Sequence, residues 1–149
     1  IHYFQMLRNK PRYITFKKFK DKKGYLIPFE SSNENVLKGN KLPIKIKRIF
    51  FSSGKKNYFR GDHAHKRCSQ LLICLKGQIK IETIFKNRKK IFKISENKVK
   101  TVLIPPMVWN RIFFLKRNSL LGVICDYKYD SKKEYIHNFK EFKKLSLIK

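Results

Sequence analysis

The chain has 149 residues, enough for one domain whose core needs no disulfide or structural metal. Apolar residues make up 42% and charged residues 32%, a globular composition that excludes a disordered tail. The formal net charge of +27 comes mainly from lysines spread along the chain, so we interpret it as a solvated basic surface and expect no nucleic-acid partner.

The first five residues precede Met6, and we interpret 1–5 as the remnant of an expression-tag linker and 6–149 as a single domain. Apolar and polar residues alternate at 44–47 and 78–82, the period of strands with one buried face. Further strands are predicted at 13–19, 48–52, 70–75, 90–94, 99–104, 111–115 and 120–127, with turn residues between them. So many short strands predict an all-β sandwich or barrel.

The C-terminal segment has a different pattern, with apolar residues three to four positions apart. Ser131 is predicted to cap a short helix there, and the helix runs through Glu134, Ile136, Phe139, Phe142 and Leu145. Asp130 is expected to cap the same helix and His137 to lie on its surface. One apolar face of the helix is expected to pack on the barrel.

The three cysteines, Cys68, Cys74 and Cys125, are odd in number and lack the spacing of zinc or redox sites. They favour a reducing compartment. No apolar stretch approaches the roughly 18 residues of a membrane span, and the N-terminus carries no signal pattern. We therefore expect a cytoplasmic protein with no membrane partner.

The segment Arg60-Gly61-Asp62-His63-Ala64-His65 places two histidines at positions i and i+2. On a strand these side chains share one face, so both imidazoles can point into one cavity. Two solvated histidines on an edge strand would have the same spacing. The pattern alone leaves both interpretations open.

The residues that follow resemble the two signatures of the cupin family. Gln70 and Gly77 fall at the spacing of the first signature, and the segment from Pro105 to Asn110 resembles the second. Cupins that bind a metal have glutamate and histidine at the positions that Gln70 and Asn110 occupy here. Since neutral amides bind divalent metals poorly, we expect no metal, and His63 and His65 would be free to act as acid and base.

Four longer segments resemble the sugar 3,4-ketoisomerase family. They are R-G-x-H-A-H-K at 60–66, Q-x-x-x-C-L-x-G at 70–77, I-P-P-x-V-W at 104–109, and Y-D-x-x-x-x-Y-I at 129–136. The resemblance implies a cupin fold, which is a double-stranded β-helix or jelly-roll barrel, with a short C-terminal helix. It also implies a homodimer in which the N-terminal strand at 13–19 is exchanged between subunits.

The reaction that this resemblance implies moves the keto group of dTDP-4-keto-6-deoxyglucose from carbon 4 to carbon 3. It passes through an enediol, needs no cofactor, and supplies a 3-keto sugar for amino-sugar synthesis and a surface glycan such as O-antigen. His65 would be the base and His63 its partner or proton donor. The expected substrate-binding residues are Arg60, Gln70, Trp109, Asn110 and Arg111.

Individual roles follow from side-chain chemistry. Arg60 would hold the diphosphate or the enediolate, unless it forms only a surface ion pair. Gln70 would hold a histidine or a sugar hydroxyl. Trp109 would pack either on the substrate or in the core. Phe50 and Phe51 stand where the family tends to have tyrosines, which leaves open whether Tyr127 or Tyr129 supplies a phenol.

Three other functions remain open at this point. A sugar-nucleotide epimerase on the same fold would use a histidine and a tyrosine beside the ketone. A cupin without catalytic activity would only bind sugar. A basic nucleic-acid binder would explain the charge, and its affinity would fall steeply with salt.

Overall fold

Short antiparallel strands make up most of the fold. The computed structural model describes residues 9–31, 40–96 and 98–147, so the expected linker remnant at 1–5 and the start at Met6 lie outside the described residues. One five-stranded sheet has the order β1 (Arg12–Thr15), β9 (Lys100–Ile104), β6 (Gln70–Lys76), β11 (Leu120–Cys125) and β4 (Arg48–Ser53). The other has the order β12 (Tyr135–Ile136), β5 (Phe59–His65), β10 (Trp109–Phe114), β7 (Gln78–Phe85) and β8 (Arg88–Ser95).

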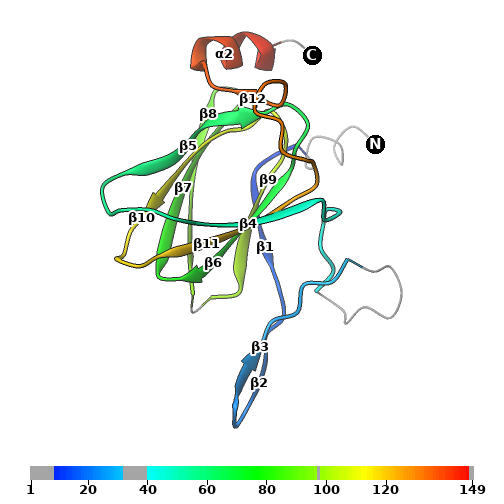
Figure 1. Cartoon of the computed structure of the whole chain (residues 1–149), viewed down its shortest axis with the longest axis vertical. Coiled ribbons are helices and arrows are strands. Elements are labelled where there is room, and N and C mark those ends of the chain that lie inside the picture. The colour runs from blue at the N-terminus through cyan, green and yellow to red at the C-terminus, as the bar shows by residue number, and fades with distance from the viewer. Residues whose placement is uncertain (1–8, 32–39, 97, 148–149) are drawn as a thin grey trace.

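The two sheets enclose one apolar core (Figure 1). Alternation along β10 illustrates why, because Asn110, Ile112 and Phe114 are buried while Arg111 between them is exposed. The inner faces of both sheets meet in a cluster that includes Leu72, Ile79, Ile81, Phe92, Val102, Ile112, Phe114 and Val123. The predicted all-β barrel is therefore confirmed, and we call the sides that face this cluster the inner faces.

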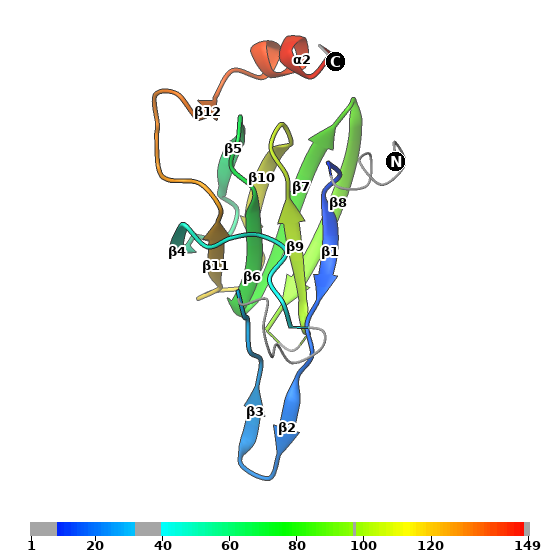
Figure 2. The same cartoon turned by 90° about the vertical axis from the view of Figure 1, so that its right-hand side faces the viewer.

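The predicted strand at 13–19 is two strands. β1 ends at Thr15 in the first sheet, and β2 (Phe19–Asp21) pairs with β3 (Gly24–Leu26) in a separate hairpin. The hairpin projects from the end of the barrel opposite the C-terminal helix, as Figures 1 and 2 both show. The first sheet therefore ends at β1, and the last backbone contact of this segment with the sheet is the Phe16 amide, which donates to the Val99 carbonyl at 3.0 Å.

The predicted strand at 44–47 is wrong. Residues 44–47 are irregular and lead into β4, although the Lys47 amide donates to the Cys125 carbonyl at 2.8 Å. Pro43 has no amide hydrogen to donate, and Ile44 packs with the apolar cluster on the outer face of the first sheet. The alternation arose because Ile44 covers that outer face from outside the sheet.

The C-terminal helix is shorter than predicted. Helix α2 spans Phe139–Leu147 and is capped by Asn138, whose Oδ1 accepts a hydrogen bond from the Glu141 amide at 3.0 Å. Asp130 instead accepts hydrogen bonds from the amides of residues 132 and 133 in a turn, so its expected role as helix cap is corrected. His137 precedes the helix and does not lie on it.

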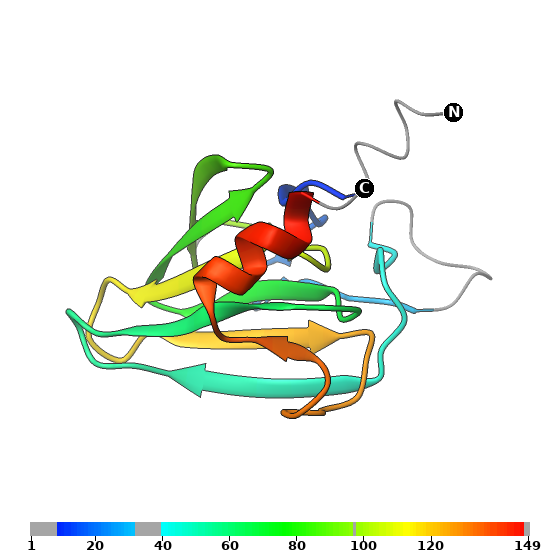
Figure 3. The same ribbon diagram turned by 90° about the horizontal axis from the view of Figure 1, so that it is seen from above.

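The helix still packs as expected, across the end of the barrel (Figure 3). Phe142 is 1% exposed and packs with Ala64, Trp109 and Ile136 on the outer face of the second sheet. In the part of the chain that the structure describes, no helix is long and apolar enough to cross a membrane.

Candidate active site

Strand β5 presents His63 and His65 on its inner face. His63 pairs with Asn110 of β10, and both side chains therefore lie on the side of the core, whereas Ala64 points outward. The two Nε2 atoms are 3.2 Å apart, and the ring planes are inclined by 82°. Because His65 is only 4% exposed, the pair is not a solvated edge pair.

The two rings face each other through their Nε2 atoms. Only one hydrogen can lie between these two atoms, so which ring donates at this contact depends on which ring nitrogens carry hydrogen. His63 also bonds to the backbone of Gly61. Among the described residues the Nδ1 atom of His65 is buried without a partner, so Nε2 is the nitrogen of His65 that faces the other imidazole.

Both imidazoles are uncharged near neutral pH. Burial lowers the pKa of His65 to about 3, and the neighbouring His63, Arg48 and His137 act in the same direction. Burial also lowers the pKa of His63, although its bond to the Gly61 backbone acts in the opposite direction. A neutral imidazole can accept a proton, so the pair can act as a base.

Tyr135 is a third member of the site. It pairs with His65 across β12 and β5, which places its side chain on the same face. Its ring centroid lies 4.4 Å from that of His65 and 4.9 Å from that of His63. His137, two residues on, stacks on Tyr135 at 5.5 Å and lies 5.8 Å from His63.

Arg48 brings a positive charge to this group from β4 on the other sheet. Its guanidinium carbon lies 4.6 Å from the ring centroid of Phe50 and 4.8 Å from that of Tyr129. Arg48 also hydrogen-bonds Tyr135. Burial raises the pKa of Tyr135, and Arg48 opposes this effect, so the phenol is protonated at neutral pH.

Comparison with known proteins identifies the family. Residues 9–146 match the model described as "FdtA: WxcM-like, C-terminal". The chain belongs to this WxcM-like FdtA family. It is 30% identical over 133 residues to the TDP-4-oxo-6-deoxy-alpha-D-glucose-3,4-oxoisomerase of Aneurinibacillus thermoaerophilus, with 88% of each chain covered. The expected family is confirmed, and with it the class of enzyme, an intramolecular oxidoreductase.

Solved structures agree with this family. QdtA, a sugar 3,4-ketoisomerase of Thermoanaerobacterium thermosaccharolyticum in complex with TDP, has a TM-score of 0.81 at 31% identity over 95% of this chain and 96% of its own. WlaRA of Campylobacter jejuni, a TDP-fucose-3,4-ketoisomerase, has a TM-score of 0.79 at 28% identity over 92% and 96%. The rmlC epimerase of Mycobacterium tuberculosis shares the fold alone, at 12% identity and a TM-score of 0.68 over 83% of this chain and 66% of its own. The predicted cupin fold is confirmed.

Two of the expected substrate-binding residues of this FdtA-family chain lie inside the barrel with the histidines. Asn110 is 1% exposed and donates from Nδ2 to the His63 carbonyl at 3.4 Å, so it supports the strand that carries the histidine pair. A Cβ on Gly61 would lie 3.0 Å from Asn110 Oδ1, which explains the glycine there. Gln70 donates toward Cys125 Sγ at 3.6 Å, and among the described residues it makes no hydrogen bond to a histidine.

Trp109 and Arg111 lie on the opposite face of the same sheet, so the structure does not bring them together with the histidine pair. Side chains alternate along β10, and a bulge at Asp62 lets its Oδ1 accept from Trp109 Nε1 at 3.1 Å and Arg111 Nε at 2.6 Å. Trp109 is 4% exposed beneath α2 and is thus a core residue. Arg60 pairs with Ile112 on the inner side, is exposed, and donates to the Ser53 carbonyl at 2.7 Å.

The sequence reasoning missed three residues of the site, namely Arg48, Tyr135 and His137. A signal for the last two was present, because Tyr135 and His137 stand at i and i+2, as His63 and His65 do. The helical spacing of the apolar residues around them obscured it. Arg48 gave no local signal, since its place in the site depends on the two sheets facing each other.

Proposed function

We propose that the chain moves the keto group of a dTDP-4-keto-6-deoxyhexose from carbon 4 to carbon 3. The contact of two uncharged imidazoles, the buried His65 and the half-buried His63, carries this proposal, since a ketone acidifies the proton on the adjacent carbon and a neutral imidazole can remove it. The relatives support the substrate class. One solved relative, a histidine-to-asparagine mutant of QdtA, is a complex with TDP-4-keto-6-deoxyglucose, at 29% identity and a TM-score of 0.80 over 91% of this chain and 93% of its own.

In this mechanism His65 removes the proton from carbon 3, and an enediol forms. His63 shares that proton across the 3.2 Å contact, and its bond to the Gly61 backbone favours its protonated form. The same proton is then delivered to carbon 4, which leaves the ketone at carbon 3. Neither a cofactor nor a metal takes part in any of these steps.

Arg60, Gln70 and Asn110 remain our proposed substrate-binding residues. Arg60 lies on the histidine side of β5 and is exposed, so its guanidinium can turn from the Ser53 carbonyl to a diphosphate. Arg60→Met should then raise KM for the nucleotide sugar and leave kcat nearly unchanged. An unchanged KM would remove Arg60 from the site.

The function is tested by incubating the protein with dTDP-4-keto-6-deoxyglucose in deuterated buffer and following carbons 3 to 5 by NMR. A keto group at carbon 3 supports the proposal. Deuterium at carbon 3 or 5 with the ketone still at carbon 4 would indicate an epimerase, and binding without either change a sugar-binding cupin. His63→Asn and His65→Asn should each abolish the shift of the ketone, and full turnover in both variants would overturn the assignment of the base.

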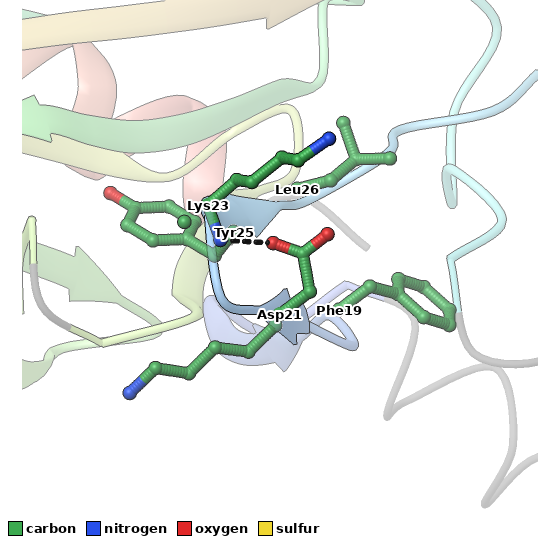
Figure 4. Close-up of a pocket in the computed structure, with 7 residues that line it drawn as sticks. Phe19, Asp21, Lys23, Tyr25 and Leu26 are labelled. Carbon is green, nitrogen blue, oxygen red and sulfur yellow. Dashed lines mark hydrogen bonds between the residues drawn. The ribbon is translucent and has the colours of Figure 1, made fainter.

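We also propose that the chain forms a homodimer through its N-terminal arm, which we define as residues 12–28. The β2–β3 hairpin of this arm exposes Tyr25 at 60% and Leu26 at 64%, and both residues line a pocket of about 350 Å³. Figure 4 shows the two side chains on the hairpin. Two strands alone are marginally stable in water, so the hairpin needs a surface to pack on. Exchange of the arm between subunits would supply one, and Ile49 and Phe51 on the outer face of β4 are 54% and 67% exposed.

The oligomeric state tests this arm. Tyr25→Ser with Leu26→Ser should halve the mass in solution measured by light scattering at micromolar concentration. Ile91→Ser, at a residue of β8 that is 49% exposed on the other sheet, is the matched control and should leave the mass unchanged. A monomeric parent protein, or a mutant that stays dimeric, contradicts the proposal.

We place the reaction in the cytoplasm, before a transamination that makes an amino sugar for a surface glycan. Cys68 and Cys125 support a reducing compartment, because they are buried close enough to hydrogen-bond each other and yet are free thiols. A 3-keto product is the substrate class that a sugar transaminase requires. Coupling the product to such an enzyme in vitro should yield a 3-amino sugar.

A further inference from the structure

We propose that Tyr135, held by Arg48, relays the oxygen-bound proton of the substrate from the hydroxyl at carbon 3 to the ketone oxygen at carbon 4. This inference rests on the proposed 3,4-keto shift. It assigns a role to a residue that neither the histidine pair nor the sequence motifs explain.

The reaction moves two hydrogens, and the histidine pair accounts for one of them. The hydrogen on carbon 3 moves to carbon 4, and the hydrogen on oxygen 3 must leave as oxygen 4 gains one. The two imidazoles are both uncharged, so neither brings a positive charge or a spare acidic proton to the ketone oxygen as carbon 3 loses its proton. A separate acid is therefore needed.

Tyr135 is placed to be that acid. Its ring lies against both imidazoles, with centroids 4.4 Å and 4.9 Å away, so a sugar in contact with the histidines also lies beside the phenol. It is only half-buried, so part of the residue is exposed. Residues 135 and 136 pair with β5, so the phenol is fixed to the strand that carries the base.

Arg48 makes the phenol a better donor. Its guanidinium lies close to two aromatic rings, those of Phe50 and Tyr129, and hydrogen-bonds Tyr135. A positive charge stabilises the phenolate that forms when the proton leaves, and it lowers the pKa of the phenol against the effect of burial. Arg48 is thus a positioning residue that acts through Tyr135.

The relay balances. In the first half, the base takes the proton from carbon 3, the C–H electrons form the C3=C4 bond, and the ketone π electrons on oxygen 4 take the Tyr135 proton. In the second half, the phenolate takes the proton from oxygen 3, and the O–H electrons form the C3=O bond. The electrons of the C3=C4 bond then take the proton from the protonated imidazole and form the new C–H bond at carbon 4. Carbon 3 is oxidised, carbon 4 is reduced, and both side chains return to their starting states.

Tyr135→Phe tests the relay, because it keeps the ring and removes only the hydroxyl. We expect kcat to fall about 10² to 10³-fold, the usual effect of losing one donor to a developing oxyanion, with KM within about twofold. Tyr13→Phe is the matched control, since its hydroxyl accepts a hydrogen bond from the Lys93 amide at 2.9 Å, and it should keep the parent kcat. Parent-like kcat in Tyr135→Phe overturns the proposal.

Arg48 gives a second readout that a purely structural role would not produce. In the parent protein, kcat should fall at high pH as the phenol loses its proton. Arg48→Met removes the charge that lowers the pKa of Tyr135, so this fall should move to higher pH while kcat at neutral pH drops. Arg48→Lys should bring both kcat at neutral pH and the pH of this fall part of the way back to the parent values. If the fall in kcat occurs at the same high pH in Arg48→Met as in the parent protein, the assigned role is contradicted.

Failure of this inference is distinguishable from failure of the proposed function. If the parent protein does not shift the ketone, the function itself is wrong. If the parent protein does and Tyr135→Phe is equally fast, only the relay is wrong. Thermal unfolding and TDP binding by calorimetry, measured for each variant, identify any mutant whose lost activity reflects a damaged fold. If Arg48→Met is damaged in this way, Arg48→Lys tests the role of the positive charge in its place.

Discussion

Glu134 anchors the segment that carries Tyr135 to the site, and its removal gives a sharp test of that anchor. The side chain is 3% exposed, and Oε1 accepts hydrogen bonds from the amides of Arg67 and Cys68, both at 2.6 Å. A hydrogen bond to a charged group contributes about 1.5–3 kcal/mol. Since Glu134→Ala removes the acceptor of two such bonds, we expect the free energy of unfolding to fall by roughly 3–5 kcal/mol.

Urea unfolding, followed by fluorescence, measures this loss. Glu134→Gln keeps an oxygen acceptor without the charge, and its loss should be roughly half as large, because neutral hydrogen bonds are about half as strong. Glu141→Ala removes an exposed carboxylate from the first turn of α2 and serves as the control, at less than about 1 kcal/mol. If Glu134→Ala lay within 1 kcal/mol of the control, the two amides would have found other partners and the anchor would not exist.

Three further perturbations follow from buried groups. Between about pH 6.5 and 3 the unfolded chain binds a proton at His65 that the folded chain does not. This difference alone should make stability about 2 kcal/mol lower at pH 5 than at pH 7. Because burial also lowers the pKa of His63, His65→Gln should reduce that slope in urea titrations without removing it, and an unchanged slope would contradict this. Asn40 is fully buried and makes three hydrogen bonds of 2.8 to 2.9 Å to the N-terminal arm. Asn40→Ala should lower the free energy of unfolding by about 3 kcal/mol and speed amide hydrogen exchange in the arm. Exchange at the parent rate would contradict this. Gly77 has φ +79°, and a Cβ there would lie 2.2 Å from Ser119 Oγ. Gly77→Ala should therefore lower the free energy of unfolding, measured by thermal unfolding, by roughly 1–3 kcal/mol. An unchanged Tm would show that the turn can relax.

Strand alternation explains why much of the barrel and the histidine pair were predictable. The period of two at 78–82 coincides with β7, whose inner residues Ile79 and Ile81 are fully buried. The same rule predicted that His63 and His65 share one face of a strand, and both lie on the inner face of β5. Both predictions depend only on the local geometry of one strand, and this geometry is encoded in neighbouring residues.

The C-terminal segment shows where a periodic pattern misleads. Ile136 and Phe142 are six residues apart and bury against the same cluster, yet one lies on a strand and the other on a helix. Spacing reports which side chains are buried, and it does not report whether the backbone turns between them. The helix prediction therefore extended back over β12 and hid Tyr135 and His137 from the site.

Trp109 and Arg111 show a different limit. The resemblance implied that both residues bind substrate, but the face on which each side chain lies depends on how the strand is registered against its neighbour. Asn110 faces the core with His63, so residues 109 and 111 face outward, and the bulge at Asp62 then holds both. A shift of one residue moves a side chain from substrate to solvent, and sequence motifs do not fix that register.

The alternation of β5 also links packing to chemistry. Ala64 lies between the two histidines, is fully buried, and faces Trp109, Ile136 and Phe142 on the outer side. Its small side chain lets Ile136 and α2 approach the strand, and the pairing of β12 that results brings Tyr135 over His65 on the inner side. The tripeptide 63–65 therefore carries both histidines and also seats the segment that carries Tyr135. Apolar burial on the outer face of β5 holds β12 in register with the strand of the histidines.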